Sequence, residues 1–344
     1  MIHRTMGYIT AISDCDVSDK ARLAEFRSLR ERVADLLKED EEHSIASQLS
    51  ELFWHDASFR AFNHARRTNT ESRKNAAVAP LLASYLDNAY VQGEVLAVSR
   101  LTDSPAEGLD RGVVSLPTVI KFVRDNRACI TRETYVCYDG LPFDCEAAAA
   151  AEHKANPHEP GVHWVAVPPS FYSQCAREIF DRLSGKAADR RRRDDQIKPG
   201  LLKWLERHLE GDDTRKIRLH RNKVLAHPAD RASRGGGPAE RLGVTLESID
   251  GLHKRLLEIG EVLSWTVLGE PLLGTPIAIP QFDQFEGFDR VFTFPEDLKS
   301  LGQLWTEMTR ETEDWSRNSL DAAPCKVPVK WPPADRAGRV AGGP

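Results

Sequence analysis

The sequence of 344 residues predicts an all-α protein, a helical bundle with a long mid-chain loop and an irregular C-terminal extension. Three observations predict this class. Apolar residues recur at three- and four-residue spacing through most of the first 270 positions. The alternation of apolar and polar residues that is typical of half-buried strands is rare. Capping residues and prolines stand where several of the periodic segments begin.

Residues 1–17 are predicted to be irregular, and a single helical domain is expected over 18–270. Its first helix begins near Ser18 and ends in the acid-rich stretch Glu39–Glu42. A second helix is predicted from residue 44 to about residue 65. The buried positions expected on these two helices are Leu23, Phe26, Leu29, Val33, Leu36 and Leu37, then Ile45, Leu49, Leu52, Phe53, Phe59 and Phe62.

A polar turn over Thr68–Asn75 should separate the second helix from the third, the most apolar so far. Pro80 fits the first turn of that helix, where a missing N–H costs little. The helix runs into Ser99–Asp103, and Ser115 should cap another that passes through Val123. The apolar positions expected on the third helix are Leu81, Leu82, Tyr85, Leu86, Ala89, Val95, Leu96 and Val98.

Residues 139–169 hold many prolines, alanines and histidines and are expected to form a loop insertion with one short helix. A helix should resume at Ser170, with Phe171, Cys175, Ile179, Phe180 and Leu183 facing inward. The run Arg190–Arg193 follows, and Pro199 should open another helix that ends before Gly211.

The C-terminal third begins with a helix that follows the acidic residues 212 and 213, which favour a helix N-terminus. The last long helix should start near Thr245 and carry Ile249, Leu252, Leu256, Ile259, Val262, Leu263 and Trp265 inward. Residues 271–321 are expected to form an extension with one helix, and residues 322–344 a disordered tail.

Composition limits the class of protein. The chain has 47 basic and 52 acidic side chains, a net charge of −5, so it is not coated for non-specific nucleic-acid binding. Its six cysteines form no Cys-x-x-Cys pair, which favours reduced thiols. No secretory signal is recognisable at the start, and no apolar run is long enough to cross a membrane. A cytoplasmic location is therefore expected.

The stretch Arg221–His227, followed by Pro228, has the most distinctive chemistry in the chain. It places a permanent cation, the amide of Asn222 and an imidazole within two helical turns. Pro228 disfavours the α conformation at His227, so the imidazole should lie at a helix C-terminus, where the helix dipole raises its pKa. Such a histidine suits general acid–base catalysis near neutral pH.

These groups suit the cleavage of RNA without a metal ion or other cofactor. His227 would exchange protons with the ribose 2′-hydroxyl or the leaving 5′-oxygen, and Arg221 would hold the phosphate oxygens as their charge grows. Asn222 would orient the ribose or the catalytic ring. Six residues separate Arg221 from His227, about 9 Å along a helix and about 120° around it, so two copies meeting about a dyad would bring the groups together more easily than one.

The same residues allow other interpretations. Arginine followed by histidine is a weak pattern, and Arg215 with His220 matches it a few residues upstream. We prefer the downstream pair because Asn222 follows its arginine and Pro228 ends its helix. The stretch would also suit a basic helix end whose histidine satisfies backbone carbonyls.

Three segments of the chain resemble the HEPN superfamily and, within it, the AbiU-like abortive-infection family of bacterial defence proteins. They are Arg221–His227, the upstream helix end Leu96–Asp103, and the closing helix from Thr245 to Trp265. The resemblance covers roughly residues 20–270. It implies a helical bundle that forms a homodimer, RNA cleavage by Arg221 and His227, and a role in phage defence or a toxin–antitoxin pair. Some superfamily members only bind nucleotides or proteins, which leaves a non-catalytic binding module as the alternative.

Further contacts with RNA are expected from Arg218 and Lys223, beside the motif, and from Arg190, Arg191, Arg192 and Arg193. The neighbouring aspartates would equally suit an ordinary solvated loop around the arginine run. Cys145, His153, His158 and His163 have the chemistry of zinc ligands, but their spacing matches no compact zinc motif, so no metal site is expected. An antitoxin or other defence protein is a further expected partner.

Overall fold

The computed structural model describes residues 7–73, 80–104, 113–155, 167–225, 245–277, 279–280, 282–286, 296 and 298–322. The longer helices are α1 (Lys20–Ala34), α2 (Ile45–Arg73), α3 (Pro80–Thr102), α4 (Leu116–Asp125), α5 (Arg132–Cys137), α6 (Cys145–Ala155), α7 (Pro169–Ser184), α8 (Pro199–Leu209), α9 (Asp212–His220), α10 (Leu246–Val267), α12 (Leu298–Arg317) and α13 (Ser319–Ala322). Two π-helical turns, η2 (Asp35–Glu39) and η5 (Arg221–Leu225), continue α1 and α9. The described residues contain no strand beyond one isolated bridge between Thr131 and Gln196, which confirms the all-α prediction.

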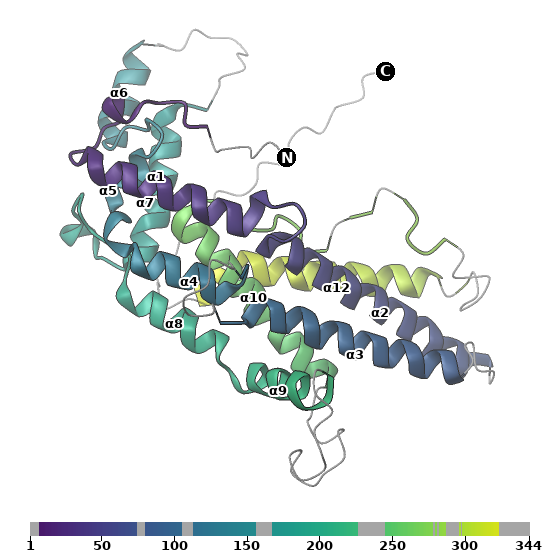
Figure 1. Ribbon diagram of the computed structural model, residues 1–344. Helices are drawn as coiled ribbons and strands as arrows, with labels where there is room; N and C mark the ends of the chain where they lie inside the picture. The colour runs from purple at the N-terminus through teal and green to yellow at the C-terminus, as the bar shows by residue number, and fades with distance from the viewer. Residues whose placement is uncertain are drawn as a thin grey trace, which may run out of the picture.

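A four-helix bundle forms the centre of the molecule. α2 packs against α3, α3 against α9, α9 against α10, and α10 back against α2. In Figure 1 these helices occupy one half of the molecule, and α1 and α5–α7 gather at the other end. α4 and α8 lie side by side between the two regions.

α10 is the central helix of this arrangement. Its start is fixed by a capping box, in which the Thr245 and Ser248 side chains each accept from the other's backbone N–H. Every residue from Leu256 to Ser264 is buried, as expected for a helix surrounded on all sides. A Cβ on Gly260 would come within 2.7 Å of the Leu272 side chain, so the glycine allows the following loop to pack closely.

A buried polar cluster joins α2, α3 and α10. His253 Nε2 lies 2.7 Å from a carboxylate oxygen of Glu94, and its Nδ1 lies 3.8 Å from Asp56. Asp56 accepts a hydrogen bond from Tyr90 at 2.5 Å and one from Arg60 at 2.8 Å. Burial alone would lower the pKa of His253, but the hydrogen bond and charge of Glu94 and the charge of Asp56 raise it. His253 is therefore placed to compensate the buried carboxylate of Glu94, while Arg60 pairs with Asp56.

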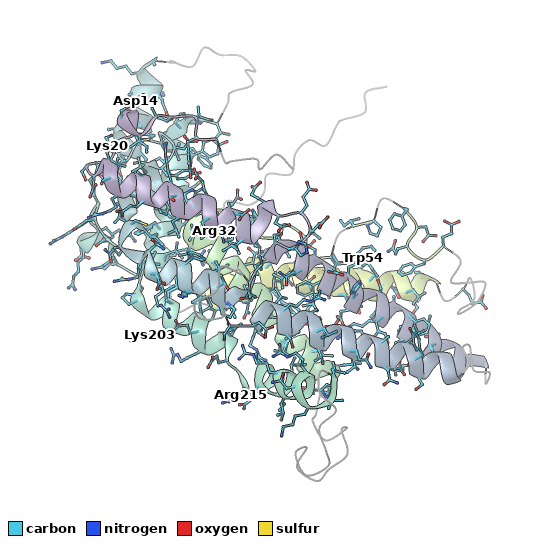
Figure 2. All side chains as sticks on the ribbon, viewed as in Figure 1. Asp14, Lys20, Arg32, Trp54, Lys203 and Arg215 are labelled. Carbon is cyan, nitrogen blue, oxygen red and sulfur yellow. The ribbon has the colours of Figure 1, made fainter. Side chains whose placement is uncertain are left out.

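The C-terminal extension is part of the folded body. α12 packs against α2 and α10, and the ring of its Trp305 lies 5.4 Å from that of Trp54, edge to face. Figure 2 labels Trp54 on the side of α2 that faces α12. The buried carboxylate of Glu261 accepts hydrogen bonds from the backbone of Leu272 at 2.9 Å and from the Ser316 hydroxyl at 2.6 Å. One α10 side chain thus anchors both the loop and the helix that follow it.

Some predicted details were wrong. The turn expected over Thr68–Asn75 is helical as far as Arg73, since contacts with α3 extend α2: Arg66 pairs with Asp87 at 3.1 Å, and Phe59 stacks on Tyr90. Phe171 was expected to face inward but is 44% exposed. The predicted tail of residues 322–344 lies outside the described residues except for Ala322, the last residue of α13.

Apolar side chains of α3 also depart from the prediction. Tyr85 is 68% and Leu96 45% exposed, and Ala89 between them is exposed as well. These residues share one outer face of α3, beside α9, whose Leu219 is 41% exposed. We call these exposed apolar side chains of the α3–α9 pair, Tyr85, Ala89, Leu96 and Leu219, the open edge. α3 therefore has two apolar faces, and only one of them packs on the core.

Within the described part of the chain, no helix combines the length and the apolar character needed to cross a membrane.

Candidate functional site

Arg221 lies where the C-terminus of α3 meets the end of α9. Its Nη1 donates to Asp103, just after α3, at 2.6 Å, and its Nε donates to Asn222 Oδ1 at 3.0 Å. The Arg221 side chain is 24% exposed, which leaves part of the guanidinium accessible to a ligand. Nη2 makes no hydrogen bond with any described residue. Two of the three guanidinium nitrogens are therefore held by acceptors, on a side chain that is not fully buried.

The backbone around Arg221 departs from regular α-helix. Residues Arg221–Leu225 form the π-helical turn η5, directly after α9. Such turns are rare and occur frequently at functional sites. Asn222 is exposed, and its amide oxygen faces Arg221. Asn222 was expected to orient a ribose or the catalytic ring; in the structure it orients the arginine.

Two further contacts lock the same corner. Arg218, one turn before Arg221, donates to the backbone carbonyl of Thr102. The hydroxyl of Ser115 donates to the backbone carbonyl of Asp103 at 2.7 Å. The C-terminus of α3 is therefore tied to α9 and to the start of α4, and Asp103 is fixed through both its side chain and its backbone.

The opposite end of α9 is attached to α10. Arg255 on α10 donates to Asp213 at 2.8 Å, and this hydrogen bond lowers the pKa of the Asp213 carboxyl. Acidic residues 212 and 213 both lie in the first turn of α9, where the helix dipole favours them. α9 is thus pinned at both ends, which gives Arg221 a defined position.

His227 and Pro228 lie outside the described residues, as does Ala226. The predicted meeting of Arg221 and His227 therefore stays a prediction. Lys223, a further expected RNA contact, lies within η5 and is half-buried.

The upstream arginine–histidine pair has a different environment. Arg215 is exposed and pairs with Asp212 in its own helix (Figure 2). His220 is half-buried, and its Nδ1 is buried with no hydrogen-bond partner among the described residues. Burial lowers the pKa of His220 below 6.5. Arg215 and His220 share no contact partner among the described residues, whereas Arg221 joins two elements far apart in the sequence.

The arginine run divides into two pairs. Arg191 lies 3.0 Å from buried Asp181, and Arg193 lies 2.5 Å from Glu133 and 3.0 Å from Asp16. These two side chains brace the loop against α5, α7 and the N-terminal segment.

Arg190 and Arg192 are exposed. Arg190 has only a 3.9 Å ion pair with exposed Asp189, and the Arg192 side chain makes no ion pair with a described residue. Arg191 and Arg193 thus contact other parts of the protein, whereas Arg190 and Arg192 extend into solvent.

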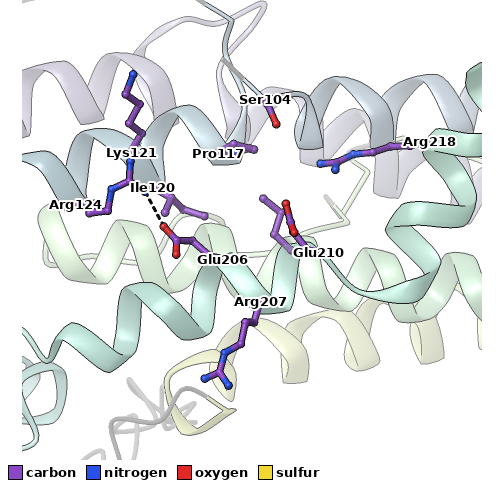
Figure 3. Close-up of a pocket in the computed structure, with 10 residues that line it drawn as sticks. Ser104, Pro117, Ile120, Lys121, Arg124, Glu206, Arg207, Glu210 and Arg218 are labelled. Carbon is purple, nitrogen blue, oxygen red and sulfur yellow. Dashed lines mark hydrogen bonds and ion pairs between the residues drawn. The ribbon is translucent and has the colours of Figure 1, made fainter. Parts of the chain in front are cut away.

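A cavity of about 670 Å³ opens beside the motif, between α4, α8 and the last turn of α9 (Figure 3). Arg218 reaches into it at one end, and the ion pair of Arg124 with Glu206, 2.9 Å long, closes the other. Its lining residues are Ser104, Pro117, Ile120, Lys121, Arg124, Glu206, Arg207, Leu209, Glu210 and Arg218.

A second cavity, of about 820 Å³, lies at the N-terminus of α8 and includes the outward arginines 190 and 192. Among the described residues, no three histidine, cysteine, aspartate or glutamate side chains cluster as metal ligands would. His158 and His163, of the four residues considered for zinc, lie outside the described residues.

Asp103 is the functional-site residue that sequence reasoning missed. It ends the segment Leu96–Asp103, but its separation of 118 residues from Arg221 hides the pairing. An acidic residue directly after an apolar helix was the only signal available. The cations Lys121 and Arg124 of α4 were missed as well, because they read as the solvated face of an amphipathic helix.

Comparison with known proteins gives one match. The family model described as AbiU2, HEPN_AbiU2, matches residues 31–272, which run from α1 through α10 to the loop that Glu261 anchors. No curated protein and no solved structure matches the chain. α12 and α13 lie beyond the matched residues.

Proposed function

The chain belongs to the AbiU2 family of HEPN proteins, and we propose that it is an endoribonuclease that cleaves RNA without a metal ion, as a homodimer, in phage defence or a toxin–antitoxin system. The position of Arg221 carries the proposal. Its guanidinium is oriented by Asp103 and Asn222 yet partly accessible, and the turn that holds it leads directly to His227.

The proposed reaction uses the ribose as its own nucleophile. His227 removes the proton of a 2′-hydroxyl, and the 2′-oxygen attacks the adjacent phosphorus. The bond from phosphorus to the 5′-oxygen breaks, and that oxygen takes up a proton. The products are a 2′,3′-cyclic phosphate and a 5′-hydroxyl. Arg221 stabilises the non-bridging oxygens as they gain charge, and its fixed orientation lowers the cost of doing so.

A second copy of the chain is proposed to complete the site. Six residues separate Arg221 from His227 in the sequence, which corresponds to about 9 Å along a regular helix, so a single copy is not expected to bring both to one phosphate easily. The open edge supplies an apolar surface on the same pair of helices as Arg221, with Leu96 and Leu219 exposed. Two copies joined there about a two-fold axis would place Arg221 of one beside His227 of the other.

Among the cations expected to contact RNA, the contacts of the structure favour some over others. Arg190 and Arg192 point outward, and Arg218 lines the cavity beside the motif. Arg191 and Arg193 are held in ion pairs with Asp181 and Glu133. We therefore assign RNA contact to the first three and a bracing role to the other two.

The test is cleavage of RNA by the purified full chain in the presence of EDTA. The wild type should leave 2′,3′-cyclic phosphate ends, and His227→Ala should lose this activity, with an expected decrease of about 10²–10⁴-fold. His220→Ala, the matched control in the neighbouring arginine–histidine pair, should retain it.

Cleavage that persists in His227→Ala, or that disappears only in His220→Ala, would contradict the mechanism. A chain that binds RNA but never cuts it would instead support the non-catalytic binding module. The ion pair of Arg221 with Asp103 alone would suit that module too. The cyclic-phosphate readout separates the two functions.

A further inference from the structure

The two cavities lie at opposite ends of the same pair of helices. The first takes Glu206 and Leu209 from the C-terminal end of α8, and the second takes Lys198 and Pro199 from its N-terminal end. α4 runs between them as well: Pro117 lines the first cavity, and Arg127, just beyond α4, lines the second. Since α4 packs against α8, the lining residues of the two cavities follow one another along this seam: Arg124 and Arg127 are three residues apart, and Pro199 lies about 10 Å along α8 from Glu206.

Both ends of this seam are enriched in positive charge. The first cavity is lined by four lysine or arginine residues against two glutamates, and the second by six against three aspartates. The whole chain has 47 basic against 52 acidic side chains, so a two-to-one excess at two linked sites is a local feature. Lys121 and Arg192, one at each end, are exposed and make no ion pair with a described residue.

The seam begins at the candidate catalytic corner. Arg218 lines the first cavity and also holds Thr102, the residue before Asp103. Ser104, the residue after Asp103, lines the same cavity. The partner of Arg221, Asp103, is thus directly adjacent in the chain to a residue that lines the first cavity. An RNA strand with a phosphate at Arg221 would therefore reach this cavity with its neighbouring nucleotides.

We propose that the seam between α4 and α8 is a binding track for single-stranded RNA, which runs from the phosphate at Arg221 through the first cavity to the arginines of the second. The inference rests on the proposed function and adds the path of the substrate. The first cavity offers apolar surface on Pro117, Ile120 and Leu209, with Lys121 and Arg218 among the residues beside it. Apolar surface for bases beside cations for phosphates is the combination that single strands need.

An acidic segment of a protein is the other ligand that a basic seam would attract. The apolar surface of the first cavity and its position next to Arg221 favour RNA. Its bases would contact the apolar surface while its phosphates contact the arginines, and an acidic peptide does not combine these two kinds of group in each unit. The N-terminus of α8, with Lys198 as its N-cap residue, lies at the second cavity. That end adds partial positive charge where a phosphate would arrive.

The experiment measures the binding of a fluorescent single-stranded oligonucleotide with 2′-O-methyl groups throughout, so that no cleavage is possible. The full chain carrying Lys121→Glu and Arg192→Glu should bind about tenfold more weakly or worse than the wild type. The slope of log affinity against log salt should become shallower by about 1.4, about 0.7 for each lost phosphate contact. Both side chains are exposed, so thermal unfolding should be unchanged.

The control is Lys299→Glu with Arg310→Glu, an equal charge change on exposed residues of α12, across the bundle from the seam. It should lower affinity only slightly. Lys121→Gln with Arg192→Gln repeats the test without introducing acids. Equal weakening in the control pair would overturn the track, and so would wild-type binding of a poly-glutamate peptide as tight as that of RNA.

The two proposals fail in different ways. A chain that cleaves RNA normally, with binding unaffected by the seam variants, retains the proposed function and loses the track. A chain that cuts no RNA but binds the oligonucleotide through Lys121 and Arg192 retains the track and loses the enzyme.

Discussion

The two edges of the four-helix bundle differ in whether another helix of the chain covers them. Along α2 and α10, the extension α12 covers the helices, and its Trp305 is only 7% exposed. Along α3 and α9, Tyr85, Leu96 and Leu219 remain exposed, and Arg221 stands at the end of that edge. The covered edge has its partner within the chain. At the open edge, apolar side chains of the same kind remain exposed in the part of the chain that the structure describes, beside the strongest chemical signature in the sequence.

This difference distinguishes residues that stabilise the folded state from residues that we propose to take part in RNA cleavage. Polar groups inside the bundle and under α12 are buried and compensated, as with His253 and Glu94 or with Glu261 and Ser316. Polar groups at the open edge are fixed but accessible, as with Arg221. Substitutions at the two edges should therefore affect different measurements.

The largest expected loss of stability is at His253. His253→Gln removes the cation beside the buried carboxylate of Glu94, while Arg60 still pairs with Asp56; losing the Glu94 pair should cost about 3–5 kcal/mol at pH 7. Urea unfolding of the two proteins measures the difference. His43→Gln, on an exposed side chain, is the control and should change little.

The same histidine predicts a dependence on pH. The folded state raises the pKa of His253, so its contribution to stability is complete below about pH 6.5 and is lost as the pH rises through the raised value. The unfolding free energy of the wild type should therefore decline toward alkaline pH more steeply than that of His253→Gln. Parallel curves for the two proteins would show that the buried histidine is not protonated.

The next effect is at the contact of α12 with the bundle. Trp305→Ala should destabilise the protein by about 3 kcal/mol, because the indole packs edge to face on Trp54 and Phe285. Cleavage by the folded fraction should not change, since α12 lies across the bundle from Arg221. Loss of cleavage under conditions where the variant is fully folded would mean that the two edges are coupled.

The smallest effect on the monomer is expected at the open edge. Leu96→Ser should change the unfolding free energy of the monomer by no more than about 0.5 kcal/mol, because its side chain is 45% exposed. The variant should nevertheless shift the protein from dimer to monomer in analytical ultracentrifugation and lower cleavage with it. A dimer unaffected by Leu96→Ser and Leu219→Ser would place the interface elsewhere.

Much of the fold follows from local patterns in the sequence. Leu23, Phe26 and Val33 are fully buried as their spacing predicts, and α10 begins at Thr245 as its capping residues indicate. The spacing of apolar residues shows that a helix has an apolar face, but not whether that face is buried in the core or exposed on the surface. The exposure of Tyr85 and Leu96 was therefore not predictable.

The site depends on contacts between distant segments, which no local pattern contains. The pairing of Asp103 with Arg221 and the seam between α4 and α8 arise only when α3, α4, α8 and α9 meet. Each cation of the seam is ordinary on its own helix. Arg190–Arg193 look equivalent in the sequence, and only their folded partners separate Arg191 and Arg193 from the other two.

A mixing experiment tests the central claim, a site shared by two copies, most directly. Arg221→Ala and His227→Ala are each inactive in the proposed mechanism, but a mixed dimer has one site with both groups intact. Since half of the randomly mixed dimers are heterodimers, equal amounts of the two variants should recover roughly a quarter of wild-type cleavage in EDTA. A mixture that exchanges subunits and stays as inactive as its components would contradict the shared site.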